Sequence, residues 1–144
     1  MNKSLLSSDK MDWATPKAFF DALNEEFNFT VDVCASEWNA KLERYWSEVD
    51  DSLSLSWVGE VCFMNPPYGR DIKHWVKKAY EESLKGAVVV GLIPSRTDTS
   101  YWHDYIQDKA DVRFIRGRLK FERPEGACDP APFPSAVIIW GLRD

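Results

Sequence analysis

Glycine and cysteine are scarce in this chain, and neither forms the spacing that common nucleotide or metal sites require. The sequence has 7 glycines and 3 cysteines among its 144 residues. No two glycines lie closer than five positions, so a G-x-G-x-x-G motif is absent, and Leu92 follows Gly86 and Gly91 where a P-loop needs lysine. The cysteines are widely spaced and accompanied by only two histidines, which argues against a disulfide framework and a structural zinc site.

Long hydrophobic runs are also missing. The longest apolar stretch, 87–93, is far shorter than the roughly 20 residues of a membrane span. Residues 1–10 contain no signal-peptide hydrophobic region. We therefore expect a cytoplasmic protein with reduced thiols. The length predicts a single domain over 12–144, preceded by a flexible tail over 1–11.

Acidic residues outnumber basic ones over the whole chain, but basic residues are concentrated in one segment. The formal net charge is −5, yet residues 113–123 carry five arginines or lysines against one acid. A basic strip on an acidic body is compatible with a focused contact to nucleic acid. It is equally compatible with a solvated edge strand that its charges protect from pairing. The charge pattern alone leaves both interpretations open.

Apolar periodicity predicts alternating strands and helices along most of the chain. Thr15 and Pro16 are typical of a helix start, as N-cap and first helical residue. The expected helices are 16–27, one beginning at Ser36 with Trp38, Leu42, Tyr45 and Trp46 on one side, 71–85, and 101–109. The expected strands are 29–34, 61–64, 87–93, 112–115, 119–121 and 135–140, with a loop over 124–134. This order predicts an α/β fold with a largely parallel sheet, whose chemistry lies beyond the carboxyl ends of the strands.

The segment Asn65-Pro66-Pro67-Tyr68 directly follows a short apolar strand. Two prolines hold the backbone extended and remove two N–H donors, which leaves carbonyl oxygens free to accept hydrogen bonds. Asn65 adds a side-chain acceptor, and Tyr68 offers a flat face for a planar ring. These four residues therefore suit the binding of a planar NH₂ group. The alternative is a proline-rich turn followed by a core tyrosine.

Asn65-Pro66-Pro67-Tyr68 resembles the catalytic motif of S-adenosylmethionine-dependent methyltransferases that modify an exocyclic or amide NH₂ group. Residues 12–16, Asp-Trp-Ala-Thr-Pro, resemble the Thr-Pro motif that contacts the methionine end of the cofactor in amino-methyltransferases. Residues 32–36, Asp-Val-Cys-Ala-Ser, stand where the first cofactor motif would be. With 51–53, Trp57, 92–99 and 116–121, the chain over 12–140 resembles the small phage-type DNA N6-adenine methyltransferases.

The resemblance implies an abbreviated Rossmann-like class I methyltransferase fold, S-adenosylmethionine as cofactor and DNA as substrate, either single-stranded or with the target adenine flipped out of a duplex. It implies no metal, and it implies the cytosol of a bacterial host as the compartment if the chain is phage-encoded. Asn65, Pro66, Pro67 and Tyr68 are the implied catalytic residues. The implied cofactor contacts are Trp13, Thr15, Pro16, Asp32, Cys34, Ala35 and Asp51. The implied DNA contacts are Arg96, Thr97, Thr99, Arg116, Arg118 and Lys120.

The chain departs from the family pattern in two ways. No glycine follows Asp32, and only residues 35–60 separate the first strand from the catalytic strand, so that half of the fold must be shortened. Three of the implied cofactor contacts have purely structural alternatives. Asp32 could be a helix cap or an ion-pair partner, Asp51 a solvated acid, and Trp13 a hydrophobic staple. Each arginine could equally form a surface ion pair. The alternative functions are methylation of adenine in RNA, methylation of a protein glutamine amide, and a non-catalytic decoy.

Overall fold

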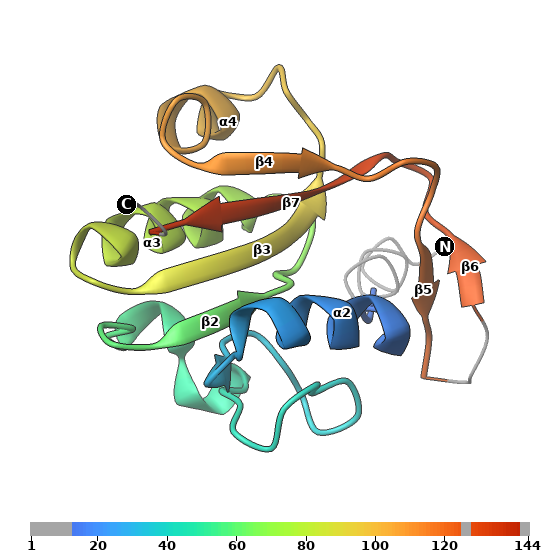
Figure 1. Cartoon of the computed structure of the whole chain (residues 1–144), viewed down its shortest axis with the longest axis horizontal. Coiled ribbons are helices and arrows are strands. Elements are labelled where there is room, and N and C mark those ends of the chain that lie inside the picture. Colours follow the sequence, from blue (N-terminus) through green and yellow to red (C-terminus); the bar gives the residue numbers. More distant parts are fainter. Residues whose placement is uncertain (1–12, 125–127, 142–144) are drawn as a thin grey trace.

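The computed structural model describes residues 13–124 and 128–141, in which a five-stranded sheet is flanked by helices (Figure 1). The predicted tail 1–11 and Asp12 lie outside the described residues. The strand order is β1 (Val31–Asp32), β2 (Val61–Met64), β3 (Val88–Pro94), β7 (Ser135–Trp140) and β4 (Asp111–Phe114). A two-stranded ribbon of β5 (Lys120–Glu122) and β6 (Cys128–Pro130) lies to the right of this sheet in Figure 1.

The sheet is parallel on one side and antiparallel on the other. β1, β2 and β3 are parallel neighbours, as expected. β7 runs antiparallel to both β3 and β4, so the expectation of a largely parallel sheet holds only for the first three strands. The connection explains this difference, because the ribbon and not a crossover helix joins β4 to β7. The chain therefore enters β7 at the same edge of the sheet at which it left β4, and β7 runs in the opposite direction.

The central strands form the core because their side chains are apolar on both faces. Every residue of β7 is buried, and so are all residues of β3 after Val88. Continuous apolar runs of this kind are typical of strands covered on both faces. The strand predictions at 61–64 and 135–140 match β2 and β7, and 87–93 matches β3 within one residue.

Two long helices flank the sheet. α2 (Lys17–Phe27) packs Phe20 edge-on against Phe63 of β2, with ring centroids 5.0 Å apart. α3 (Ile72–Leu84) buries Ile72, Val76 and Ala79 and ends before Gly86, whose φ of 118° favours glycine. Both helices were predicted nearly to their ends. The third helix, α4 (Ser100–Tyr105), is shorter than the predicted 101–109.

The predicted N-cap of the first helix is wrong. Pro16, in an extended conformation, occupies the N-cap position of α2, and the helix begins at Lys17. Pro16 accepts the first helical hydrogen bond through its carbonyl, from Phe20 N at 3.0 Å. Thr15 therefore lies one residue before the N-cap, and its hydroxyl oxygen accepts a hydrogen bond from Asn65.

The predicted helix at Ser36 does not form. Residues 33–47 make turns and bends, followed by the short 3₁₀ turns η1 (Glu48–Asp50) and η2 (Ser52–Ser54). The backbone of this segment pairs with β1 instead of with itself: Asp32 N donates to Arg44 O at 3.1 Å, and Trp46 N donates to Asp32 O at 2.9 Å. Pairing across the edge of the sheet has replaced local helical pairing.

The loop predicted over 124–134 contains a strand. β6 pairs antiparallel with β5, with Phe121 opposite Asp129. The prolines of this segment concealed the strand, since proline is depleted in strands and tolerated at edges. None of the helices in the described part of the chain is long and apolar enough to cross a membrane.

Glu82 of α3 anchors the turn that leads into β2. Its Oε1 accepts a hydrogen bond from Trp57 N at 2.6 Å, while Lys78 and Lys85 approach Oε2 at 3.3 and 3.4 Å. Burial favours the neutral acid, but the Trp57 N–H and the Lys78 ammonium outweigh it and hold the pKa of Glu82 below its usual range. Trp57 Nε1 in turn donates to Ser52 O at 3.0 Å.

We expect Glu82→Ala to lower the free energy of unfolding by about 1–3 kcal/mol, because it leaves the buried Trp57 N–H without an acceptor. Glu82→Gln retains a carbonyl acceptor and should lose less. Urea denaturation of both variants measures the difference. Asp21→Asn, which removes an ion pair at the surface, is the control and should leave the midpoint unchanged. Equal stability of Glu82→Ala and the unaltered chain would contradict this account.

Candidate active site

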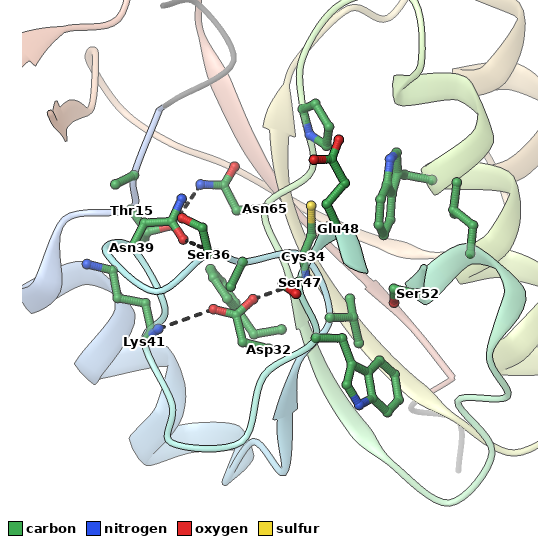
Figure 2. A pocket seen from close by; sticks show the side chains of 18 of the residues that line it. Thr15, Asp32, Cys34, Ser36, Asn39, Lys41, Ser47, Glu48, Ser52 and Asn65 are labelled. Carbon is green, nitrogen blue, oxygen red and sulfur yellow. Dashed lines mark hydrogen bonds between the residues drawn. The ribbon is translucent and has the colours of Figure 1, made fainter. Parts of the chain in front are cut away.

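A cavity of about 530 Å³ opens at the carboxyl edge of β1 and β2 (Figure 2). Its walls come from residues 13–15, the loop after β1, the 3₁₀ turns, the end of β2 and the first turn of α3. The parallel pairing of β1 with β2 sets Asp32 beside Phe63, so both strands deliver their following residues to the same edge. A concave site of this size at a strand edge is where small ligands bind in α/β proteins.

Most of the predicted cofactor residues meet in this cavity. Two predicted catalytic residues, Asn65 and Pro67, line it as well. Pro16, Pro66 and Tyr68 do not line it. The predicted cofactor residues in its wall are Trp13, Thr15, Asp32, Cys34, Ala35 and Asp51.

The buried carboxylate of Asp32 organises the loop that forms the cavity floor. The side chain is 2% exposed, and its two oxygens accept hydrogen bonds from Cys34 N at 3.3 Å and Lys41 N at 3.2 Å. Burial raises the pKa of Asp32 to about 7, against the opposing effect of the two N–H donors. Asp32 therefore caps the loop and places an ionisable group with a pKa of about 7 in the cavity wall.

Acidic side chains outnumber basic ones around the cavity. Asp32, Glu48, Asp51 and Asp71 line it, whereas Lys41 is engaged by Glu122, with Nζ 3.1 Å from Oε1. Even with the Asp32 carboxyl protonated, acidic side chains remain in excess, and this favours a ligand that carries positive charge. Glu48 and Asp71 were missed at the sequence level, where an acid in a loop or near a helix start resembles a solvated residue.

Two serine hydroxyls of the cavity wall have no hydrogen-bond partner among the residues that the structure describes. Ser36 Oγ and Ser52 Oγ are both buried and unpaired, and both residues line the cavity. Buried polar atoms are rarely left unpaired unless a ligand or water completes them. Their position therefore supports a polar ligand in this cavity. The sequence analysis predicted that Ser36 begins a helix, and it mentioned Ser52 only as part of segment 51–53, which resembles the methyltransferase family.

Asn65 is held at the cavity wall by three hydrogen bonds. Its Nδ2 donates to Trp13 O at 2.6 Å and to Thr15 Oγ1 at 3.0 Å. Its Oδ1 accepts from Tyr68 Oη at 2.7 Å. The amide is therefore oriented with both N–H groups toward the N-terminal segment. Oδ1 has two lone pairs, so it can accept a second hydrogen bond.

Tyr68 is buried, whereas its predicted role in stacking on a base requires an accessible ring face. The side chain is 8% exposed, and its ring meets those of Phe121 and Phe133 edge-on at 6.3 and 5.5 Å. Its hydroxyl lies 2.7 Å from Asn65 Oδ1 and 2.9 Å from Leu92 O. Burial raises the pKa of Tyr68 well above its usual value, so the hydroxyl keeps its proton. Stacking on a base stays a prediction.

Cys34 lines the cavity as a neutral thiol. Burial, together with the neighbouring carboxylates of Asp32 and Glu48, raises its pKa. Because the thiolate is the nucleophilic form, this environment disfavours covalent chemistry at Cys34. Among the described residues, no group of three or more His, Cys, Asp or Glu side chains is placed to hold a metal ion.

Most of the predicted DNA contacts lie at the same edge of the sheet as the cavity. β3 and β4 both run antiparallel to β7, so the residues after them, Arg96 and Arg116, emerge at the edge where Asn65 follows β2. Four of the six side chains are exposed without a side-chain hydrogen bond among the described residues: Arg96, Thr97, Arg116 and Lys120.

Two of the predicted DNA contacts have structural partners. The Thr99 hydroxyl caps α4, accepting from Trp102 N at 3.3 Å and donating to Arg96 O at 2.8 Å. Arg118 Nη1 donates to Ala131 O at 3.4 Å, yet the residue is exposed. Arg113, part of the basic strip, forms a two-pronged ion pair with Glu26, at 2.8 and 2.6 Å. The strip is thus partly committed to ion pairing.

Comparison with known proteins adds independent findings. The model of the DNA N-6-adenine-methyltransferase (Dam) family matches residues 2–140. A DNA N-6-adenine-methyltransferase of Haemophilus phage HP1 is 29% identical over 117 residues, which cover 79% of this chain and 68% of that protein. A DNA N-6-adenine-methyltransferase of Escherichia phage T1 is 29% identical over 110 residues, which cover 74% of this chain and 45% of that protein.

The raised pKa of Asp32 predicts a pH dependence of stability. In the unfolded chain the carboxyl loses its proton near pH 4, whereas in the folded chain it keeps the proton up to about pH 7. Between these values the folded state binds more protons, so the Asp32 contribution favours folding at low pH and is lost as the pH rises through about 7. Glu26, Glu60, Glu82 and Glu122, whose pKa values are lowered, contribute a stability that is constant above about pH 4.5 and is lost only below it.

Denaturant unfolding of the chain and of Asp32→Asn between pH 4.5 and 8 measures this contribution. Because asparagine does not titrate, the variant should lack the decline seen in the unaltered chain, so the stability of the unaltered chain relative to the variant should fall as the pH rises to about 7. Parallel curves across this range would show that Asp32 is ionised throughout.

Proposed function

This chain belongs to the DNA N-6-adenine-methyltransferase (Dam) family, and we propose that it transfers a methyl group from S-adenosylmethionine to adenine N6 in DNA at a centre formed by Asn65-Pro66-Pro67-Tyr68. The observation that carries this proposal is the position of Asn65. It follows β2 directly, lines the cavity, and has its amide oriented so that Oδ1 can accept another hydrogen bond.

The cavity fits the proposed cofactor in size and charge. A volume of about 530 Å³ lies within the roughly 300–1,000 Å³ of small-molecule sites. S-adenosylmethionine, when bound, supplies an electrophilic methyl group on a positively charged sulfur, which the acidic lining would favour. Ser36 and Ser52 offer unpaired hydroxyls to its polar groups. The residues that would hold it are Trp13, Thr15, Asp32, Cys34, Ala35 and Asp51, with Ser36 and Ser52 added.

We further propose that the fold is an abbreviated Rossmann-like class I methyltransferase fold. Three parallel strands, β1 to β3, begin the sheet, and the cavity lies at their carboxyl edge. Residues 33–60 contain turns and 3₁₀ turns but no strand, which is the shortened half that the sequence predicts. The Asp32 carboxylate, by binding two N–H groups of the loop, does part of what a glycine-rich turn does elsewhere.

Asn65 and Pro66 act by orienting the substrate amino group. The lone pair of adenine N6 is delocalised into the ring, which makes the nitrogen a weak nucleophile. Asn65 Oδ1 and the Pro66 carbonyl accept its two N–H groups and draw the nitrogen toward a tetrahedral geometry. Because Pro66 does not line the cavity, this requires its carbonyl to become accessible when the base enters. The lone pair then points at the methyl group, and the acceptors stabilise the positive charge that develops on nitrogen. No strong general base is required, because the alkylated nitrogen is acidic enough to release its proton to water.

The target base has to leave the duplex to reach Asn65. Unstacking costs a few kcal/mol, and enzymes that act on a base offset it with contacts in the pocket. In the proposed complex Tyr68 stacks on the base, which requires that its covering contacts with Phe121 and Phe133 loosen. Arg96, Thr97, Arg116, Arg118 and Lys120 provide phosphate or base-edge contacts beside it.

Family membership favours DNA over the other acceptors that the motif allows. An acceptor panel tests this choice: labelled S-adenosylmethionine with duplex DNA, single-stranded DNA, RNA and a protein extract, with product nucleosides identified by mass. N6-methyladenine in DNA supports the proposal. Label only in RNA or only in protein overturns the substrate, and a chain that binds no cofactor is a decoy of the same fold.

We expect Asn65→Ala to abolish methyl transfer, by at least about 100-fold, because it removes the acceptor that orients the amino group. Cofactor binding, measured by calorimetry with S-adenosylhomocysteine, should change little, since the side chain forms only one part of the cavity wall. Full turnover by this variant would sink the catalytic assignment. Loss of cofactor binding as well would show that Asn65 supports the cavity instead.

The salt dependence of DNA binding tests the basic strip. Arg116→Ala should lower the slope of log K against log salt by about 0.9, the value for one lost phosphate contact. Arg113→Ala is the matched control: it makes the same charge change three positions away, at a side chain that Glu26 already engages. Equal slopes for the two variants would indicate a general charge effect and no specific contact at Arg116.

A further inference from the structure

We propose that Thr15 is a positioning residue: its hydroxyl oxygen accepts the second N–H of the Asn65 amide and so holds the amide in the orientation that the Trp13 carbonyl selects. The inference rests on the proposed catalytic role of Asn65 and adds a group that acts through it. Its basis is the hydrogen-bond network that joins the segment before α2 to the end of β2 (Figure 2).

The amide of Asn65 has only one orientation that satisfies its neighbours. Trp13 O is a carbonyl and can only accept, and it lies 2.6 Å from Nδ2. Rotating the amide by half a turn would bring Oδ1 against this carbonyl and set two acceptors in contact. The Thr15 hydroxyl takes the second N–H at 3.0 Å. Both N–H groups are therefore used on one side, and Oδ1 is directed to the other.

This orientation is what the proposed chemistry requires. Oδ1 must accept an N–H of the substrate, and an amide free to rotate would present its own donors there for part of the time. Tyr68 completes the arrangement: its single proton has two acceptors, Asn65 Oδ1 at 2.7 Å and Leu92 O at 2.9 Å. Tyr68 can therefore hydrogen-bond Oδ1 while the site is empty and turn to Leu92 O when a substrate N–H takes its place.

Thr15 is held independently of Asn65, as a positioning group must be. Its side chain is 1% exposed. The preceding residue, Ala14, pairs with Glu122 of β5 through two backbone hydrogen bonds, of 2.9 and 3.3 Å. Pro16 follows and occupies the N-cap position of α2. The hydroxyl is thus presented to Asn65 by a segment fixed on both sides.

The test compares one substitution that removes the hydroxyl with one that keeps it. Thr15→Val keeps the shape and removes the hydroxyl, whereas Thr15→Ser keeps the hydroxyl. At saturating cofactor and DNA, the single-turnover methylation rate of Thr15→Val should fall about 10- to 100-fold, the effect expected when a buried polar group loses its partner. Thr15→Ser should stay within about threefold of the unaltered chain. Ser83→Ala, which removes a hydroxyl at the end of α3 that donates to Tyr80 O and does not line the cavity, is the control and should leave the rate unchanged.

A second measurement separates positioning from cofactor contact, since Thr15 also lines the cavity. The affinity for S-adenosylhomocysteine should change less than threefold in Thr15→Val, so the loss appears in the rate at saturation and not in binding. In the protein without ligand, the two side-chain amide protons of Asn65 should exchange faster with solvent in Thr15→Val than in the unaltered chain. This readout does not depend on turnover.

The outcomes distinguish this inference from the proposed function. Full activity of Asn65→Ala overturns the proposed function and the inference together. An inactive Asn65→Ala with a fully active Thr15→Val overturns the inference alone. So does a Thr15→Ser variant as slow as Thr15→Val, which would show that the hydroxyl is not the group that matters. A loss confined to cofactor affinity overturns it as well and assigns Thr15 to ligand binding.

Discussion

The site depends on the parallel pairing of β1 with β2. With Asp32 beside Phe63, the chain after β1 and the chain after β2 leave the sheet at the same edge, and the cavity forms between them. β1 has only two residues, so its own ladder supplies few hydrogen bonds. The shortness of this strand is offset on its outer side, where Arg44 and Trp46 bond the backbone of Asp32. A strand that would otherwise be a frayed edge is thereby covered.

Asp32 stabilises this arrangement through both its backbone and its side chain. Its backbone joins β1 to the returning loop, and its side chain caps Cys34 N and Lys41 N within that loop. The loop needs no glycine because a carboxylate, and not a tight backbone approach, defines its path. The same burial that makes Asp32 an effective cap raises the pKa of its carboxyl to about 7. Loop geometry and cavity charge are consequently linked through one ionisable group.

Sequence reasoning identified the elements whose patterns are local. β2, α3, β3 and β7 follow from continuous apolar runs or a helical stripe, and the motif at Asn65 follows from its place after β2. The helix predicted after Ser36 was wrong because its apolar spacing also suits a chain that pairs with β1. Such a long-range pairing leaves no periodic signal in the sequence. The hydrogen bond of Thr15 was missed for a similar reason, since its partner Asn65 lies 50 residues away in the sequence. Ser36 and Ser52 have no local signal at all; only burial without a partner marks them.

The ribbon binds the two parts of the site to each other. Glu122 of β5 accepts hydrogen bonds from Lys41 of the cavity loop and from Lys17 N at the start of α2, while its backbone pairs with Ala14. Phe121, the preceding residue, packs against both Trp13 and Tyr68. The basic residues Arg116, Arg118 and Lys120 enter this same ribbon. The ribbon therefore contacts both the segment that bonds Asn65 and the loop that Asp32 caps, so the proposed base and cofactor sites share one support.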